Sequence, residues 1–168
     1  DLDGVLADLH KPFAKAAVAL FPELEARAVA DPDVGASPPD EEPGAEVPDE
    51  APAPPSSSLP LSRPQVDAVW KHLQAQEDFW ETLDEIEPGA VQAIADHTAS
   101  RRWEVIFLTK RPSTDGLTSQ RQSQRWLQRH GFPMPSVFVV QGSRGSIADA
   151  LALDVVIDDL PANCVDII

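Results

Sequence analysis

Two carboxylates stand one residue apart at the start of this 168-residue chain, in the stretch DLDGVLAD. Because alternate residues of an extended segment point to the same side, Asp1 and Asp3 can both reach one reaction centre. A carboxylate can attack phosphorus to form an aspartyl-phosphate, and a neighbouring carboxylate can transfer protons. This spacing therefore fits a pair that acts on a phosphoryl group.

A second acidic pair, Asp158 and Asp159, lies near the other end of the chain. Taken alone, such a pair is more often a solvated strand end or a helix cap. Together with Asp1, Asp3 and Thr109, in this order along the chain, it favours a metal site instead. Hard oxygen ligands of this kind suit Mg²⁺, which keeps some of its waters and takes phosphate oxygen as a further ligand.

Hydroxyl and cationic side chains that could bind phosphate follow two apolar runs. Thr109 could donate a hydrogen bond to a phosphoryl oxygen, and either Arg144 or Lys110 could offset the phosphoryl charge. Surface charge is the first interpretation of Lys110 and Arg111, and a contact with phosphate is the alternative for either residue.

The elements that would carry these residues alternate between strands and helices. Short apolar runs predict strands at 105–108, 137–140 and 155–157, and helical patterns predict helices at 88–100, 117–130 and 146–153. This alternation indicates an α/β fold with a parallel sheet covered on both faces. Ligands of such sheets gather at the carboxyl ends of the strands, where all four polar groups would meet.

The N-terminal half predicts a small all-helical unit interrupted by a linker. Helical spacing of apolar residues occurs at 13–24 and again at 66–73, and we interpret Trp70, Phe79 and Trp80 as the core of this unit rather than as substrate-stacking residues. Between the helices, 31–64 is rich in Pro, Ala, Ser and acid, which predicts a disordered linker, with a protein-interaction tether as the alternative.

Composition excludes several classes of partner and site. The net charge of −15 argues against long nucleic acid as a partner, and no apolar run is long enough to cross a bilayer. A cytoplasmic location is the default expectation. Cys164 is the one cysteine, so no internal disulfide can form and a zinc site is not expected; we expect its side chain to pack in the protein.

Four motifs resemble those of the haloacid dehalogenase-like (HAD) phosphohydrolase superfamily, in the family order. They are DLDGVLAD at 1–8, FLTKRP at 107–112, GSRGSIADAL at 142–151 and DVVIDDLPAN at 154–163. The resemblance implies a three-layer Rossmann-like core formed by 1–12 and 88–168, with a small α-helical cap inserted after the first motif at 13–87. The segment FWETLDEIEPGAVQAI resembles the connection between cap and core in deoxyribonucleotidase-type 5′-nucleotidases.

The resemblance also implies a role for each matching residue. Asp1 would be the nucleophile and a metal ligand. Asp3 would be the general acid/base, with its backbone carbonyl on the metal. Thr109 would bind the phosphoryl group, and Asp158 with Asp159 would complete the Mg²⁺ site.

The third motif departs from the family, which usually places a lysine there. Arg144 is the nearest match in this chain, and Lys110 is the alternative source of the cation. An arginine keeps the positive charge but presents a wider, planar fork, so the two residues are not equivalent.

The expected activity is therefore that of a Mg²⁺-dependent phosphatase with a small phosphorylated substrate. A nucleoside monophosphate is the first candidate, followed by a polynucleotide end or the phosphate of a small metabolite. The alternatives are a non-catalytic binding or scaffold protein that uses the acidic linker, and a phosphotransferase that passes the phosphoryl group to an acceptor other than water.

The position of the first motif carries one more expectation. In the resembling family a central strand ends at the nucleophile, and here no strand precedes Asp1. We therefore expect the full-length protein to supply that strand, and the 168-residue chain alone to be unstable and nearly inactive. A free α-amino group would also place positive charge beside the Asp1 carboxylate.

Overall fold

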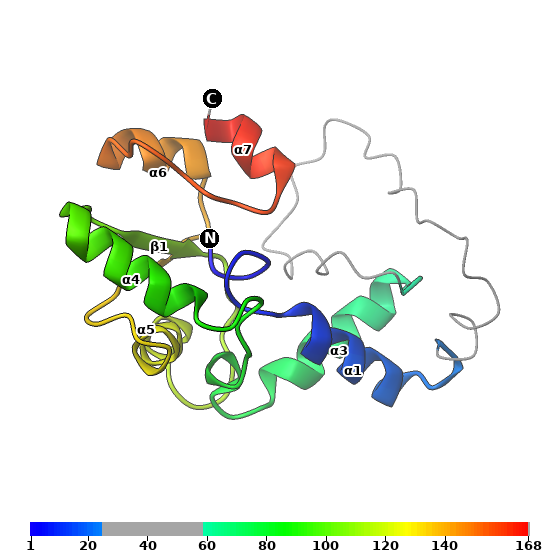
Figure 1. Ribbon diagram of the computed structural model, residues 1–168. Helices are drawn as coiled ribbons and strands as arrows, with labels where there is room; N and C mark the ends of the chain where they lie inside the picture. Colours follow the sequence, from blue (N-terminus) through cyan, green and yellow to red (C-terminus); the bar gives the residue numbers. More distant parts are fainter. Residues whose placement is uncertain (25–58, 168) are drawn as a thin grey trace.

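The protein has a mixed α/β fold, described by a computed structural model for residues 1–24 and 59–167 (Figure 1). Most of the predicted linker lies outside these residues. In chain order the elements are α1 (His10–Leu20), α3 (Arg63–Gln74), the 3₁₀ helix η1 (Phe79–Glu81), α4 (Ala90–Arg101), β1 (Ile106–Thr109), α5 (Ser119–Arg129), β2 (Ser136–Val139), α6 (Arg144–Leu151) and α7 (Pro161–Ile167).

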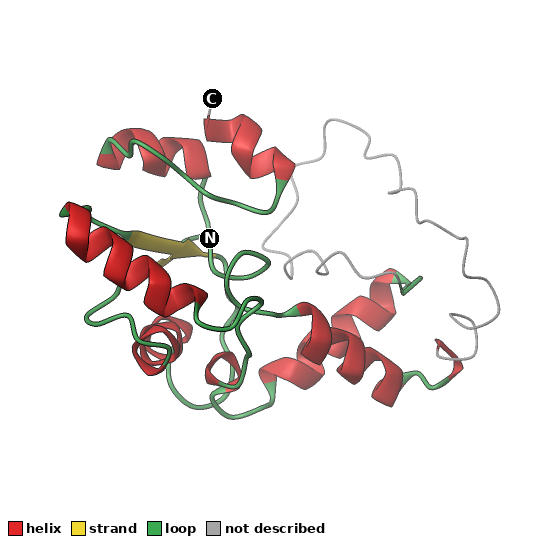
Figure 2. Ribbon diagram, viewed as in Figure 1, coloured by secondary structure: helices red, strands yellow, loops and turns green. Residues whose placement is uncertain are grey.

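The sheet of the described residues consists of β1 and β2, which pair in parallel. In Figure 2 the sheet is the small yellow element among the red helices. Each strand is shifted by one residue from its predicted range, and Thr109 pairs with Val139 at the carboxyl end. Helix α5 connects the two strands and packs on both β2 and η1. This βαβ unit confirms the predicted parallel arrangement for two of the three strands.

The predicted strand at 155–157 is wrong for the described chain. This segment is an irregular loop, although its sequence is apolar and β-branched. A strand is defined by its ladder of backbone hydrogen bonds, whereas the contact between this segment and the start of the described chain is a single bond, from the α-amino nitrogen of Asp1 to the carbonyl of Ile157 at 2.6 Å. Apolar composition alone therefore did not place this segment in the sheet.

Helices α1 and α3 pack against each other beside the α/β part of the molecule (Figure 1). Helix α3 begins one residue before Pro64, the predicted helix starter, and Ser62 and Gln65 form a capping box at its start. Phe13 of α1 meets the edge of Trp70 of α3, with ring centroids 5.3 Å apart. The prediction that the aromatic residues of this half form a core is confirmed, because Trp70, Phe79 and Trp80 are all buried.

One continuous apolar cluster joins the helical half to the βαβ unit. It extends from Leu2 through Trp70 and Trp80 to Phe107 and Val137. Burial on this scale is the main term that holds such a fold together. The loop that starts at Leu2 is thus anchored in the centre of the protein, which fixes the position of its two neighbouring carboxylates.

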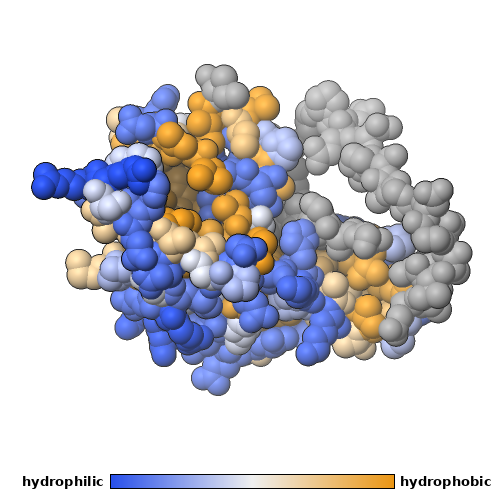
Figure 3. Space-filling view, in the orientation of Figure 1, coloured by the Kyte–Doolittle hydropathy of each residue, from blue (hydrophilic) through white to orange (hydrophobic). Residues whose placement is uncertain are grey.

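Helices α6 and α7 form a separate pair that contributes no residue to this cluster within the described chain. Large apolar side chains are exposed on and near this pair, where Figure 3 shows orange residues over the upper part of the molecule. They are Leu151, Val155, Ile157, Leu160 and Val165. Cys164 is also exposed on α7, so the expectation that it packs in the interior is wrong.

A search of the described helices for a membrane-spanning segment finds none that is long and apolar enough.

Candidate functional site

A cleft of about 300 Å³ lies at the carboxyl ends of β1 and β2. It is bounded by the loop after Asp1, by the residues that follow each strand, and by the aromatic residues of the helical half. The sequence-predicted residues on its wall are Asp1, Asp3, Thr109, Lys110, Arg144 and Asp159. The expectation that these polar residues from distant parts of the chain converge is therefore confirmed for these six, although Asp159 follows a loop and not a strand.

Three of the four predicted metal ligands form one acidic group. Carboxylate oxygens of Asp1, Asp158 and Asp159 all lie within 4.8 Å of one another. Asp3 is outside this group. The arrangement offers three hard oxygen donors, the donor type that Mg²⁺ prefers.

A glycine allows two of these carboxylates to come together. Gly4 has a φ of +78°, and a Cβ atom at this position would overlap the Oδ2 atom of Asp159. Burial against this loop raises the pKa of Asp159, and the negative charge of Asp158 raises it further. Burial has the opposite effect on a cationic group, and it lowers the pKa of the α-amino group of Asp1. Crowded carboxylates of this kind favour a bound cation.

Arg144 is the buried cation beside this acidic group. Its Nη2 atom donates to Oδ2 of Asp1 at 3.1 Å, and its Nε atom lies 3.7 Å from Oδ2 of Asp158. Its Nη1 atom is buried and has no hydrogen-bond partner among the described residues. Burial lowers the pKa of Arg144, and the charge of Asp158 opposes this shift. A guanidinium remains charged under these conditions, so the two N–H groups of Nη1 are donors without an acceptor among the described residues.

The start of α6 holds Arg144 in this place. Ser143 caps the helix by accepting from the N–H of Ser146 at 3.0 Å, and its hydroxyl donates to Asp166 of α7 at 2.8 Å. Asp166 also accepts from the N–H of Gly145 at 2.7 Å. These bonds tie the first turn of α6 to α7, and they lower the pKa of Asp166.

Asp158 serves both the acidic group and the next helix. Its Oδ1 atom accepts from the N–H of Leu160 at 3.0 Å and from the side-chain amide of Asn163 at 2.8 Å, while its Oδ2 atom faces Arg144. Oδ1 thus closes a turn ahead of α7 and contacts a side chain of that helix, while Asp158 also belongs to the acidic group.

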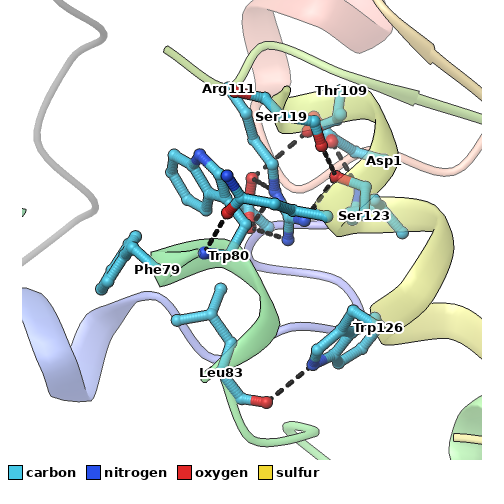
Figure 4. A network of polar contacts seen from close by, with 12 residues as sticks. Asp1, Phe79, Trp80, Leu83, Thr109, Arg111, Ser119, Ser123 and Trp126 are labelled. Carbon is cyan, nitrogen blue, oxygen red and sulfur yellow. Dashed lines mark hydrogen bonds and ion pairs between the residues drawn. The ribbon is translucent and has the colours of Figure 1, made fainter. Parts of the chain in front are cut away.

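Asp3 is held by a different cation, Arg111. The Nη2 and Nε atoms of Arg111 donate to the two carboxylate oxygens at 2.6 Å and 2.9 Å, and Thr109 donates to Oδ2 at 3.2 Å. The remaining guanidinium nitrogen donates to Ser123 of α5 at 2.7 Å, and the guanidinium lies over the ring of Trp80 at 4.7 Å (Figure 4). Arg111 is fully buried, so its interpretation as surface charge is wrong.

The two candidates for the third-motif cation differ in their surroundings. Arg144 is buried and contacts Asp1, whereas Lys110 is exposed on the wall of the cleft. The sequence suggested surface charge or a phosphate contact for Arg111 and did not predict its pairing with Asp3, although its position two residues after Thr109 carried a usable signal. In an extended segment, alternate residues point to the same side.

The far wall of the cleft comes from the helical half of the chain. Leu9, His10, Trp70 and Trp80 line it. The Nε1 atom of Trp70 is buried and has no partner among the described residues. Trp70 and Trp80 thus belong both to the core and to the cleft, a combination that the sequence interpretation treated as alternatives.

Comparisons of this chain with protein-family models, with curated proteins and with solved structures find no match.

Proposed function

We propose that this chain carries the site of a Mg²⁺-dependent phosphomonoester hydrolase that acts through an aspartyl-phosphate. The proposal includes membership of the HAD-like superfamily, with a three-layer Rossmann-like core and a helical cap. It rests on the sequence motifs together with the residues that meet in the cleft.

The observation that carries the proposal is Arg144, whose Nη2 atom contacts Asp1 while its buried Nη1 atom has no partner in the part of the chain that the structure describes. A buried N–H group without a partner is costly, so its persistence beside a carboxylate nucleophile is best explained by an anionic ligand. A phosphoryl group fits, because it would accept from Arg144 while its phosphorus faces the Asp1 carboxylate. Thr109, whose hydroxyl lies at the same strand end, is a second donor for it.

The chemistry proceeds in two displacements. The Asp1 carboxylate attacks phosphorus, the bond from phosphorus to the ester oxygen breaks, and that oxygen takes a proton from Asp3. A water molecule then gives a proton to Asp3 and attacks the same phosphorus. The bond to Asp1 breaks, which releases inorganic phosphate and restores the carboxylate.

The residues that would hold Mg²⁺ are Asp1, Asp158 and Asp159, with the backbone carbonyl of Asp3 as a further donor. The ion would supply positive charge to the phosphoryl oxygens when bound. The three clustered carboxylates fit this ion by donor type, and their mutual repulsion would be relieved by it.

The cleft wall of Leu9, His10, Trp70 and Trp80 supports a substrate with a planar, partly apolar leaving group. A nucleoside monophosphate has this character and is the first substrate that we propose. A polynucleotide end or a small-metabolite phosphate follows. We place the protein in the cytoplasm, as expected from its sequence.

Release of inorganic phosphate by the full-length protein tests the proposal. With Mg²⁺ and a panel of nucleoside monophosphates and sugar phosphates, we expect turnover that EDTA abolishes and that Asp158→Asn lowers at least tenfold. Asp154→Asn removes an exposed carboxylate four residues earlier, outside the cleft wall, and should leave turnover unchanged. Metal-independent turnover, or the absence of turnover on the whole panel, would contradict the proposal.

A further inference from the structure

The Arg111–Asp3 pair has a geometry that a surface ion pair lacks. Both oxygens of Asp3 accept hydrogen bonds from the guanidinium, and Arg111 is itself fixed by Ser123 of α5 and by the ring of Trp80. The side chain of Arg111 is completely buried, while Asp3 keeps 18% of its surface exposed toward the cleft. The pair is thus rigid on the arginine side and open on the carboxylate side.

We propose that Arg111 is the positioning residue for Asp3 in the second displacement, a role that rests on the proposed function. The guanidinium fork holds the two carboxylate oxygens of Asp3 in a single orientation beside the cleft. In that orientation the Asp3 carboxylate can take a proton from the attacking water. Arg111 is buried and does not line the cleft, so its proposed effect acts only through Asp3.

The network links this orientation to the helical half of the protein. Trp80 lies under the guanidinium, is fixed by a hydrogen bond from its Nε1 atom to the carbonyl of Pro112 at 3.0 Å, and lies 6.4 Å from the ring of Trp70 in α3. Helix α3 therefore reaches Asp3 through two packed aromatic rings and one guanidinium. Ser123 supplies the matching support from the βαβ unit.

Pre-steady-state kinetics with p-nitrophenyl phosphate separate the two displacements. This leaving group departs without protonation, so the first displacement does not need Asp3 as an acid. In Arg111→Lys, which keeps the charge and loses the fork, we expect hydrolysis of the aspartyl-phosphate to slow about tenfold or more, while its formation rate stays within about twofold. A burst of p-nitrophenol should then precede the slow steady state.

Two further variants keep the test decisive. Ser123→Ala removes one support of Arg111 without touching Asp3, and it should slow the same step by a smaller factor. Arg129→Lys alters another arginine–carboxylate pair, with Glu81 at 2.7 Å, outside the cleft wall and should change neither step. If Arg111→Lys fails to fold, the rate of aspartyl-phosphate hydrolysis in Ser123→Ala alone tests the positioning role.

The possible outcomes distinguish this inference from the proposed function. A merely structural role would reduce the burst amplitude, through loss of active protein, and leave both rate constants unchanged. That result, or equal slowing of both steps, would overturn the positioning role while the unaltered protein still turned over. Absence of any metal-dependent turnover by the unaltered protein would instead overturn the proposed function.

Discussion

Arg144 lies 3.1 Å from Asp1 although 143 positions separate them in the chain. The contact joins the first turn of α6 to the loop that begins the chain, and it leaves Nη1 of Arg144 buried without a partner among the described residues. One guanidinium therefore fixes the proposed nucleophile and keeps a free donor beside it. If this donor binds the phosphoryl group, as proposed, replacing Arg144 should weaken the binding of phosphate.

Replacing Arg144 should weaken phosphate binding more than it weakens the fold. Arg144→Met removes both the contact with Asp1 and the free N–H group, so the inhibition constant of inorganic phosphate should rise about tenfold or more, a hydrogen bond to a charged group contributing roughly 1.5 to 3 kcal/mol. Arg144→Lys keeps the charge and should recover part of this loss. The inhibition constant is measured by following turnover at increasing concentrations of inorganic phosphate. Equal constants for the unaltered protein, Arg144→Met and Arg144→Lys would contradict the prediction.

Gly4→Ala should disturb the acidic group. The left-handed φ of +78° should cost roughly 1 to 2 kcal/mol with any side chain, and the added Cβ would also push Asp159 away from Asp1. Gly89→Ala is the matched control, since its φ is +85° with no atom within 4 Å of the new Cβ. Both variants should lose similar stability in urea unfolding, and Gly4→Ala alone should lose Mg²⁺ affinity by calorimetry. Loss of Mg²⁺ affinity in both variants would count against the Gly4–Asp159 contact as the cause.

The raised pKa of Asp159 predicts a stability that falls as pH rises. In the metal-free protein this carboxyl binds its proton more tightly when folded than when unfolded, so its contribution becomes unfavourable above the ordinary pKa of about 4. Asp159→Asn should therefore stabilise the EDTA-treated protein at pH 7, and the gain should vanish at lower pH. Urea unfolding of both proteins at a series of pH values from 7 down to about 4 measures this gain in the free energy of unfolding.

Mg²⁺ should make the unaltered protein more stable than Asp159→Asn, the reverse of their order in EDTA. A ligand that binds only the folded state raises its stability, so Mg²⁺ should raise the melting temperature of the unaltered protein. Asp159→Asn lacks one of the proposed ligands and should respond much less. An identical response of both proteins would contradict a role for Asp159 in metal binding.

Loss of the Arg111 side chain should be the most destabilising of these changes. Arg111→Met leaves the Asp3 carboxylate without its fork and should cost about 3 kcal/mol, the low end for a broken buried pair, because Asp3 keeps part of its surface in water. Arg129→Met is the control: Glu81 also contacts Arg125 at 3.2 Å, so the loss there should be under about 1 kcal/mol. Denaturant unfolding of both variants checks the difference, and equal losses would show that the Arg111 pair has no special place in the core.

The sequence predicted the elements around the site well where local pattern decides structure. Pro64 predicted the start of α3 to within one residue, and the apolar runs before Thr109 and Gln141 predicted β1 and β2 to within one residue each. Periodicity and capping are properties of neighbouring residues, so they are readable without the fold.

Long-range pairing decided the features that the sequence did not predict. The segment 155–157 has the composition of a strand but is not in the sheet of the described chain. In the motif FLTKRP, Arg111 has no local feature that distinguishes it from a surface arginine. Its burial depends on Ser123 and Trp80, which lie 12 and 31 positions away in the chain. Likewise, the sequence placed Asp3 among the metal carboxylates, whereas the structure pairs it with Arg111.

Covalent trapping on Asp1 tests the central claim most directly. The full-length protein is mixed with a ³²P-labelled nucleoside monophosphate and Mg²⁺, quenched in acid within milliseconds, and mapped by peptide mass spectrometry. We expect one phosphoryl group on Asp1, formed fast enough to account for turnover and absent from Asp1→Asn, which should also be inactive. Turnover without label on Asp1, or full activity of Asp1→Asn, would contradict the account.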